Sequence, residues 1–249
     1  SRGRQRSRWA LIGALRGLLV FRQRSGSSLC YACGKLNRVD ASVCFYCGRR
    51  NPGLWGFGPG IGRLVGGLDF AALVTVVAVS AYIASLALDP RAALSPRGVF
   101  DLFSPGGRPL LALGMAGAVP WRAGHWWTVL TAIYLHGSLL HIVFNLLWIR
   151  QLLPDVEEVY GQARTIVIFT LSGTAGFLLS NAAGNPFTLG ASGAVFGVLG
   201  AMVWYGRRRG GLFGAAVLRQ YGSWALILFV FGLLGMQVDN WGHAGGFLG

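Results

Sequence analysis

The feature that most constrains this chain is a run of nineteen residues, Phe70 to Leu88, without a single charged side chain. A helix of that length can cross the hydrocarbon core of a bilayer. The whole chain is 53% hydrophobic and only 12% charged, with a mean hydropathy of +0.53, which lies outside the ordinary range of soluble proteins. The sequence therefore predicts an all-α, multi-pass integral membrane protein.

Further apolar stretches bring the expected number of transmembrane helices to six. The later five are expected at 126–149, 165–181, 189–205, 221–238 and from about residue 240 onward. The connection 89–125 is rich in proline and glycine, and its length predicts a structured loop partly buried at the interface. The sixth apolar pattern is cut at Gly249 and the chain lacks an initial methionine, so we expect a fragment with a truncated sixth helix. A last helix that really ended there would be too short to cross, and would predict weak folding.

Positive charge is concentrated before the first span. The net charge is +14, and residues 1–66 carry twelve Lys/Arg against the single Asp40. Next to a span, the positive-inside rule and attraction to anionic lipid explain this better than the alternative, nucleic-acid binding. With an inside N-terminus, eighteen Lys/Arg lie on the inner side and four on the outer. This predicts a cytoplasmic N-terminus, in the inner membrane of a prokaryote.

Four regions are expected along the chain. Residues 1–29 predict a basic amphipathic helix on the membrane surface, with disorder as the open alternative; a signal peptide is disfavoured because the apolar run is interrupted. Residues 30–50 hold a small cysteine module, and residues 51–66 form a Gly/Pro-rich linker. Residues 67–249 form the membrane domain.

All four cysteines of the chain lie in the small module, as two CxxC pairs: Cys30, Cys33, Cys44 and Cys47. Four thiolates suit a tetrahedral zinc ion, and a glycine follows each pair, where the backbone must turn. The pattern resembles a zinc ribbon with a short spacer. Two disulfides are the alternative, which a reducing cytosol opposes.

The expected second span is unusually polar, since it contains His136, His141 and Asn145. Polar side chains inside a membrane face the bundle interior and suggest function. His141 and Asn145 are four residues apart and share a helix face, whereas helical spacing turns His136 away from His141. Hydrogen bonding between helices is the alternative role.

A serine, Ser192, lies among glycines at the start of the expected fourth span. The glycines recur at helical spacing and predict a smooth stripe: Gly190, Gly193, Gly197 and Gly200. The sixth span carries a similar series: His243, Gly246 and Gly249. If the two stripes meet, Ser192 and His243 come within reach near the outer ends of their spans. A glycine packing motif with an incidental serine is the alternative.

Three motifs together resemble the signature of the rhomboid intramembrane serine proteases. They are His136-Gly-Ser-Leu-Leu-His141-Ile-Val-Phe-Asn145, Gly190-Ala-Ser192-Gly193 and Asp239-Asn240-Trp-Gly-His243-Ala-Gly-Gly246. The resemblance covers about residues 67–249, in the family's order. It implies a six-transmembrane-helix rhomboid bundle, here preceded by the small zinc ribbon.

The resemblance also implies roles for individual residues. Ser192 would be the nucleophile and His243 its general base, with no third carboxylate and no cofactor for catalysis. His141 and Asn145 would join the Ser192 backbone amide in an oxyanion hole, and Asp239 is interpreted as a residue at the start of a helix. Supporting positions are His136, Gly190, Gly193, Phe196 and Trp126.

The chain departs from the family's pattern at two places. Trp126 is followed by Trp127 where the family often has Trp-Arg, and Phe196 stands where tyrosine is common. Phe196 could still pack on the ring of His243. The implied activity is hydrolysis of peptide bonds in or near transmembrane segments, with membrane-protein substrates, the lipid bilayer and a cytosolic partner of the zinc module as partners. The alternative function is a non-proteolytic, rhomboid-like protein that binds membrane clients.

Overall fold

The computed structural model describes residues 22–65, 69–95, 98, 101–234 and 238–249. The amphipathic helix expected within residues 1–29 lies mostly outside these ranges. The chain forms two compact units, Ser1–Leu68 and Asp69–Gly249, which are described separately below.

The first unit is built on a short antiparallel hairpin. Strands β1 (Ser27–Leu29) and β2 (Leu36–Arg38) pair with Ser28 opposite Asn37. Helices η1 (Leu54–Gly56) and α2 (Gly58–Val65) follow, within the stretch expected to be a linker. That stretch is hydrogen-bonded to the hairpin region, since the N–H of Tyr31 donates to the carbonyl of Pro52 at 3.1 Å.

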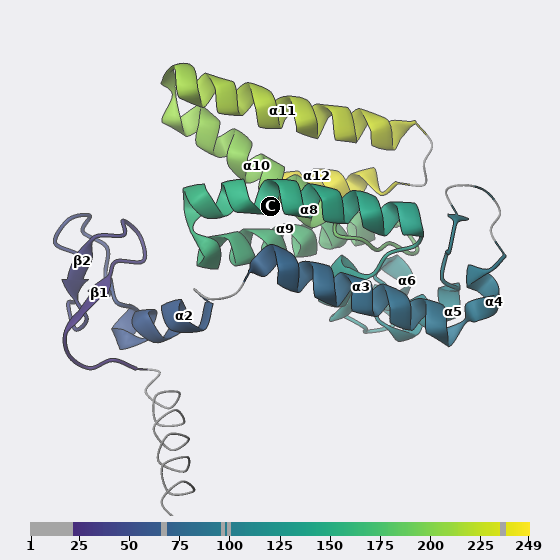
Figure 1. Ribbon diagram of the computed structural model, residues 1–249, viewed down its shortest axis with the longest axis horizontal. Coiled ribbons are helices and arrows are strands. Elements are labelled where there is room, and N and C mark those ends of the chain that lie inside the picture. Colours follow the sequence, from purple (N-terminus) through teal and green to yellow (C-terminus); the bar gives the residue numbers. More distant parts are fainter. Residues whose placement is uncertain (1–21, 66–68, 96–97, 99–100, 235–237) are drawn as a thin grey trace, which may run out of the picture. The chain divides into compact units, whose positions relative to one another are not determined.

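The second unit is a helical bundle (Figure 1). Its long helices are α3 (Phe70–Leu88), α8 (Leu139–Tyr160), α9 (Gln162–Ala182), α10 (Ser192–Arg209), α11 (Gly211–Leu233) and the shorter α12 (Asn240–Leu248). In the described part of the chain, four of these are long and apolar enough to cross a membrane: α3, α8, α9 and α11. Helix α10 ends in three arginines, and α12 has nine residues.

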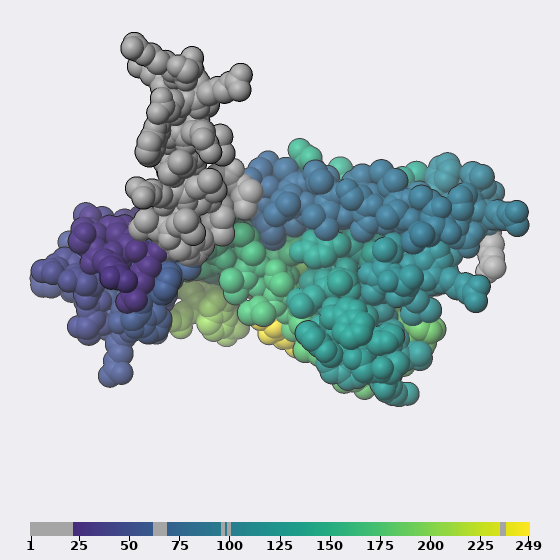
Figure 2. Space-filling view, turned by 90° about the horizontal axis from the view of Figure 1, so that it is seen from below, coloured from purple at the N-terminus to yellow at the C-terminus, as the bar shows by residue number. Residues whose placement is uncertain are grey.

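The connection between α3 and α8 is structured, as expected from its length. It contains α4 (Pro90–Ala93), α5 (Gly107–Ala112), α6 (Ala118–Arg122), α7 (Thr128–Thr131) and η3 (Ala132–Tyr134). In the space-filling view these residues and α3, blue to teal, share one face of the unit (Figure 2). Because α5 and η3 pack against α3, and α6 and α7 pack against α9, the connection is part of the bundle.

The second span does not begin where hydropathy predicts. Helix α8 starts at Leu139, far beyond Trp126, because Ser138 is extended (φ −162°, ψ 167°) and its Oγ accepts from the N–H of His141 at 3.3 Å. A serine in that position caps a helix. At the other end, α8 continues past Ile149 to Tyr160, where Gly161 (φ +79°) ends it.

Two more boundaries differ from the expectation. Helix α10 begins at Ser192 and not at Leu189, because Gly190 has φ +120°, outside the helical region. Helix α11 begins at Gly211, ten residues before Tyr221, and ends at Leu233. Arg219 and Gln220 lower the local hydropathy without interrupting the helix, so the apolar pattern alone places its start too late.

The core of the bundle is made by close contact between α9, α10 and α12. A Cβ on Gly246 would overlap the carbonyl oxygen of Gly193, and a Cβ on Gly197 would overlap the side chain of Ser172. Helix α10 therefore lies directly against both neighbours, which agrees with the expected meeting of the two small-residue stripes. Helices α11 and α3 lie on opposite sides of this centre (Figure 1).

Candidate active site

Ser192 is the first residue of α10 and is half-buried. The first N–H groups of a helix have no partner within it and carry its positive dipole end. The preceding turn is fixed by Gly190, whose N–H donates to the carbonyl of Ala132 at 2.9 Å. The Ser192 hydroxyl and its backbone amide therefore stand together at the same helix end.

His243 lies in the first turns of α12, and only 5% of its surface is exposed. Its Nε2 is 2.9 Å from Oγ of Ser192. The imidazole stacks on the ring of Phe196, with centroids 4.2 Å apart and an interplanar angle of 19°. Within the described residues its Nδ1 has no hydrogen-bond partner. The stacked ring, and not a carboxylate on Nδ1, thus orients the histidine.

Asp239 caps α12, as the sequence suggests, and also has a wider role. Its Oδ1 accepts from the N–H of Gly242 at 2.9 Å and from Nδ2 of Asn185 at 2.8 Å. Its Oδ2 accepts from Oγ1 of Thr188 at 2.6 Å. Asn185 and Thr188 belong to the turn between α9 and α10, so one carboxylate joins the helix that carries His243 to the turn before Ser192.

The same turn is held from the other side by the long connection after α3. The N–H of Thr188 donates to the carbonyl of Ala116 at 2.8 Å, and the N–H of Ala118 donates to the carbonyl of Asn185 at 2.7 Å. These contacts, and those of Asp239 with Asn185 and Thr188, were not predicted. The only signal in the sequence is the aspartate four residues before His243.

His141 lies over the turn that leads into α10. A Cβ on Gly190 would lie 2.7 Å from its Cε1 and Nε2, so only glycine leaves room for the ring. The Nδ1 of His141 accepts from the N–H of Gly137 at 3.4 Å, which leaves Nε2 as the nitrogen that carries the proton in a neutral imidazole. This N–H then lies beside Gly190, two residues before Ser192.

Asn145 is 4% exposed and lies one turn further along α8. Its Nδ2 donates to the carbonyl of His141 at 2.9 Å. An amide carries two N–H groups, so a second one is left for another acceptor. His141 and Asn145 therefore share a face, as their spacing predicts.

The prediction that His136 is turned away from His141 is wrong. The two rings meet edge to face, with centroids 5.1 Å apart and an angle of 69°. His136 precedes the Ser138 cap and is not helical, so helical spacing does not apply to it. Its ring is fully buried and neither nitrogen has a partner among the described residues.

Trp126 lies in the turn between α6 and α7 and is 64% exposed. It meets Trp127 edge to face, with centroids 6.1 Å apart, and Trp127 lies against the ring of His125 at 5.0 Å. The two tryptophans thus belong to an aromatic group on the connection between α3 and α8.

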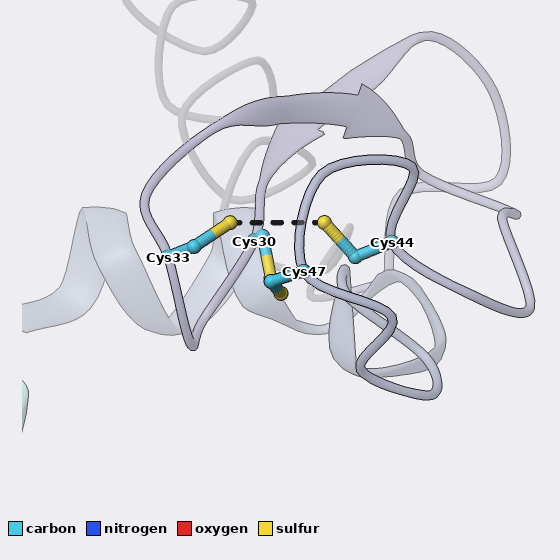
Figure 3. A group of neighbouring side chains, drawn as sticks. All are labelled: Cys30, Cys33, Cys44 and Cys47. Carbon is cyan, nitrogen blue, oxygen red and sulfur yellow. Dashed lines mark hydrogen bonds between the residues drawn. The ribbon is translucent and has the colours of Figure 1, made fainter.

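The four cysteines of the first unit converge on one point (Figure 3). Their sulfur atoms all lie within 4.8 Å of one another, so the cluster could hold a metal ion. Sγ of Cys30 is 3.8 Å from that of Cys47, and Cys33 is 3.7 Å from Cys44. A tetrahedral ion with Zn–S bonds of about 2.3 Å places its sulfurs about 3.8 Å apart. The donor set and spacing therefore fit zinc.

The surroundings of the cluster lower the pKa of one cysteine and raise that of another. Burial acts to raise the pKa of Cys44, but the N–H groups of Cys47 and Tyr46 and the amide of Asn37 stabilise its thiolate, so that its pKa falls to about 6. The N–H of Arg49 acts to lower the pKa of Cys47, but burial and the neighbouring sulfurs raise it to about 12. A bound cation would favour the thiolate at all four positions.

Asn37 is a supporting residue that the sequence pattern does not reveal. Its Nδ2 donates to Sγ of Cys44 at 3.3 Å, and its Oδ1 accepts from the N–H of Phe45 at 3.0 Å. It is buried on β2. One side chain thus fixes the second cysteine pair on the hairpin that carries the first.

Comparison with known proteins identifies relatives for the helical unit. The family described as "Rhomboid domain" matches residues 123–249. The chain is 34% identical over 130 residues to rhomboid protease GluP of Bacillus subtilis, covering 51% of this chain and 25% of the relative. It is 36% identical over 157 residues to rhomboid-like protease 3 of Toxoplasma gondii, covering 59% and 57%. Rhomboid protease GlpG of Salmonella newport is 33% identical over 125 residues, covering 49% and 45%. The chain thus spans from a quarter to just over half of the length of these relatives.

Proposed function

The chain belongs to the rhomboid family, and we propose that it is an intramembrane serine endopeptidase that hydrolyses peptide bonds in or near transmembrane segments of other membrane proteins. The observation that carries the proposal is the 2.9 Å separation of Oγ of Ser192 and Nε2 of His243. Two polar groups at that distance, brought from α10 and α12 and enclosed by apolar helices, are arranged for nucleophilic catalysis.

In the proposed reaction, Oγ of Ser192 attacks the scissile carbonyl carbon while Nε2 of His243 accepts the hydroxyl proton. The carbonyl π bond breaks and its electron pair moves to oxygen. When the C–N bond then breaks, His243 returns the proton to the leaving amine. Water then attacks the acyl-enzyme carbonyl while His243 accepts its proton. When the bond to Oγ of Ser192 breaks, His243 returns that proton to Oγ and the serine is regenerated. Stacking on Phe196 keeps the imidazole facing Ser192 throughout.

The negative oxygen formed in the first step needs hydrogen-bond donors. We assign this role to the backbone N–H of Ser192 and the side chains of His141 and Asn145. Support comes from the position of His141 directly over Gly190 and from the second N–H of Asn145. These donors are fixed by the fold before substrate arrives, which is the condition for stabilising charge as it develops.

The proposed substrates are transmembrane segments with a small residue at the cleavage site. A helix must open before its backbone can reach Ser192, so glycine or proline in the substrate should help. We propose that the N-terminus is cytoplasmic and that the site faces the exterior of a prokaryotic inner membrane, as the distribution of Lys/Arg favours. We retain 30–50 and 67–249 as the limits of the cysteine module and the protease domain.

For the cysteine module we propose a structural zinc ion held by Cys30, Cys33, Cys44 and Cys47. The ion would crosslink two short turns in a unit too small to build much apolar core. No step of the proposed hydrolysis uses it.

The test is cleavage of a model transmembrane substrate by the full chain reconstituted in lipid. Ser192→Ala and His243→Ala should each abolish cleavage. Ser223→Ala removes an exposed hydroxyl from α11 and should leave the rate unchanged, which makes it a matched control. Equal cleavage by all four proteins would contradict the proposal. Substrate that co-purifies uncleaved with the wild type would favour a client-binding protein instead.

A further inference from the structure

The two cysteine turns have the same architecture. In the first, the N–H of Cys30 donates to the carbonyl of Lys35 at 2.8 Å, and in the second, the N–H of Cys44 donates to the carbonyl of Arg49 at 2.7 Å. The glycine after each pair has φ +69°. Each turn therefore projects the residues between its cysteines outward and places a cation directly behind its glycine.

Aromatic rings project from both turns. Phe45 is 91% exposed, Tyr46 is 61% exposed and Tyr31 is 43% exposed. The rings of Phe45 and Tyr46 meet edge to face, with centroids 5.5 Å apart. An apolar ring held this far out in water is unfavourable unless something covers it. The turns thus present an aromatic surface for a partner.

The unit that carries this surface is rich in exposed positive charge. Six exposed cations lie in the described part of the unit: Arg22, Arg24, Lys35, Arg38, Arg49 and Arg50. Within residues 22–65 the sole acidic side chain is Asp40, and it is paired with Arg38 at 2.7 Å. A partner that complements the turns therefore offers apolar contacts to the rings and negative charges to the cations.

We propose that the tips of the two cysteine turns dock on an anionic lipid surface. Aromatic rings prefer the headgroup level of a bilayer, and cations beside them bind anionic headgroups. The chain enters its first apolar helix at Phe70, twenty residues after Arg50, so a bilayer is always within the reach of the chain. The proposal does not depend on proteolysis.

The experiment measures how fast hydroxyl radicals oxidise Phe45, Tyr46 and Tyr31 in the full chain. The protein is reconstituted in phosphatidylcholine alone, or in an equal mixture of phosphatidylcholine and phosphatidylglycerol. Each cation near an anionic surface should favour docking by about fivefold. We expect slower oxidation of the three rings in the anionic bilayer, and raised salt should abolish the difference.

Two triple variants provide the control. Lys35→Gln with Arg49→Gln and Arg50→Gln should remove the protection, whereas Arg207→Gln with Arg208→Gln and Arg209→Gln removes equal charge from the end of α10 and should not. Metal content of each protein reports whether the module is still folded. Equal oxidation rates of the wild type in both bilayers would overturn the proposal. Protection that appears only when RNA is added would also overturn it, in favour of a nucleic-acid surface.

Discussion

At the scale of single residues, only a few contacts position Ser192 and His243 in the candidate site. His243 is oriented by a stacked phenylalanine and by the start of its own helix, without a hydrogen bond to Nδ1 among the described residues. The serine is the first residue of a helix. Each supporting contact is therefore individually testable.

The Asn145 side chain should matter for rate more than for stability. Removal of one oxyanion donor typically raises the barrier by about 2.7 to 4 kcal/mol, a factor of about 10² to 10³ in kcat. Asn145→Ala should therefore reduce kcat by that factor with little change in KM, measured on a reconstituted substrate. A variant with normal kcat would remove Asn145 from the proposed oxyanion hole.

Asp239 should act as a positioning residue. Asp239→Ala removes the acceptor of three hydrogen bonds, from Gly242, Asn185 and Thr188. Since hydrogen bonds to a charged group contribute about 1.5 to 3 kcal/mol, we expect kcat to fall by at least about tenfold. Thr188→Val removes one of the three donors and should have a smaller effect.

Exchanging the Asp239 and Asn185 side chains tests whether their contact affects the rate of cleavage or only the stability of the fold. In the double variant Asp239→Asn with Asn185→Asp, an amide and a carboxylate still face each other, so activity should recover relative to Asp239→Asn alone. No recovery, with melting temperatures equal in both proteins, would show that the link between the turn and α12 does not control the rate.

At the scale of helices, contact between α10 and α12 brings Ser192 and His243 together. Gly246→Ala would overlap the carbonyl of Gly193, and overpacking of this kind costs about 1 to 3 kcal/mol. We expect lower thermal stability and loss of cleavage. The control is Gly222→Ala in α11, where the nearest atom to a new Cβ is 3.9 Å away in the side chain of Val203. Equal stability of both variants would contradict the close packing.

The ends of a helix were predicted well only where the sequence marks them with polar residues. Helix α3 matches the predicted span residue for residue, because Asp69 and Asp89 flank the apolar run and Asp69 caps it by accepting from Ala72. The start of α8 could not be predicted from hydropathy, since the apolar residues before Ser138 look the same whether or not they are helical.

Some contacts between residues far apart in the sequence could be predicted, and others could not. The approach of Ser192 to His243 could be inferred because Ser192 lies beside one stripe of glycines and His243 belongs to the other. Asp239 and Asn185 are 54 positions apart, and no periodicity connects them. Periodicity also failed to predict the contact of His136 with His141, because His136 lies in a non-helical segment.

At the scale of the molecule, the cysteine module and the bundle are separate compact units, so loss of metal should affect them differently. Cys30→Ser and Cys44→Ser remove the two buried cysteines and should lower the zinc bound per chain. Trypsin should then cleave faster after Lys35 and Arg49, while the helical unit melts unchanged. Zinc content equal to that of the wild type would contradict the proposed ligands.

The central claim is that Ser192 is a nucleophile activated by His243. The most direct measurement is covalent labelling of the full chain, reconstituted in lipid, with a fluorophosphonate serine probe, followed by mapping of the modified peptide. We predict that the wild type carries the label on Ser192, that Ser192→Ala carries none, and that His243→Ala reacts much more slowly. Absence of label on Ser192 of the wild type, or labelling at the same rate without His243, would contradict it.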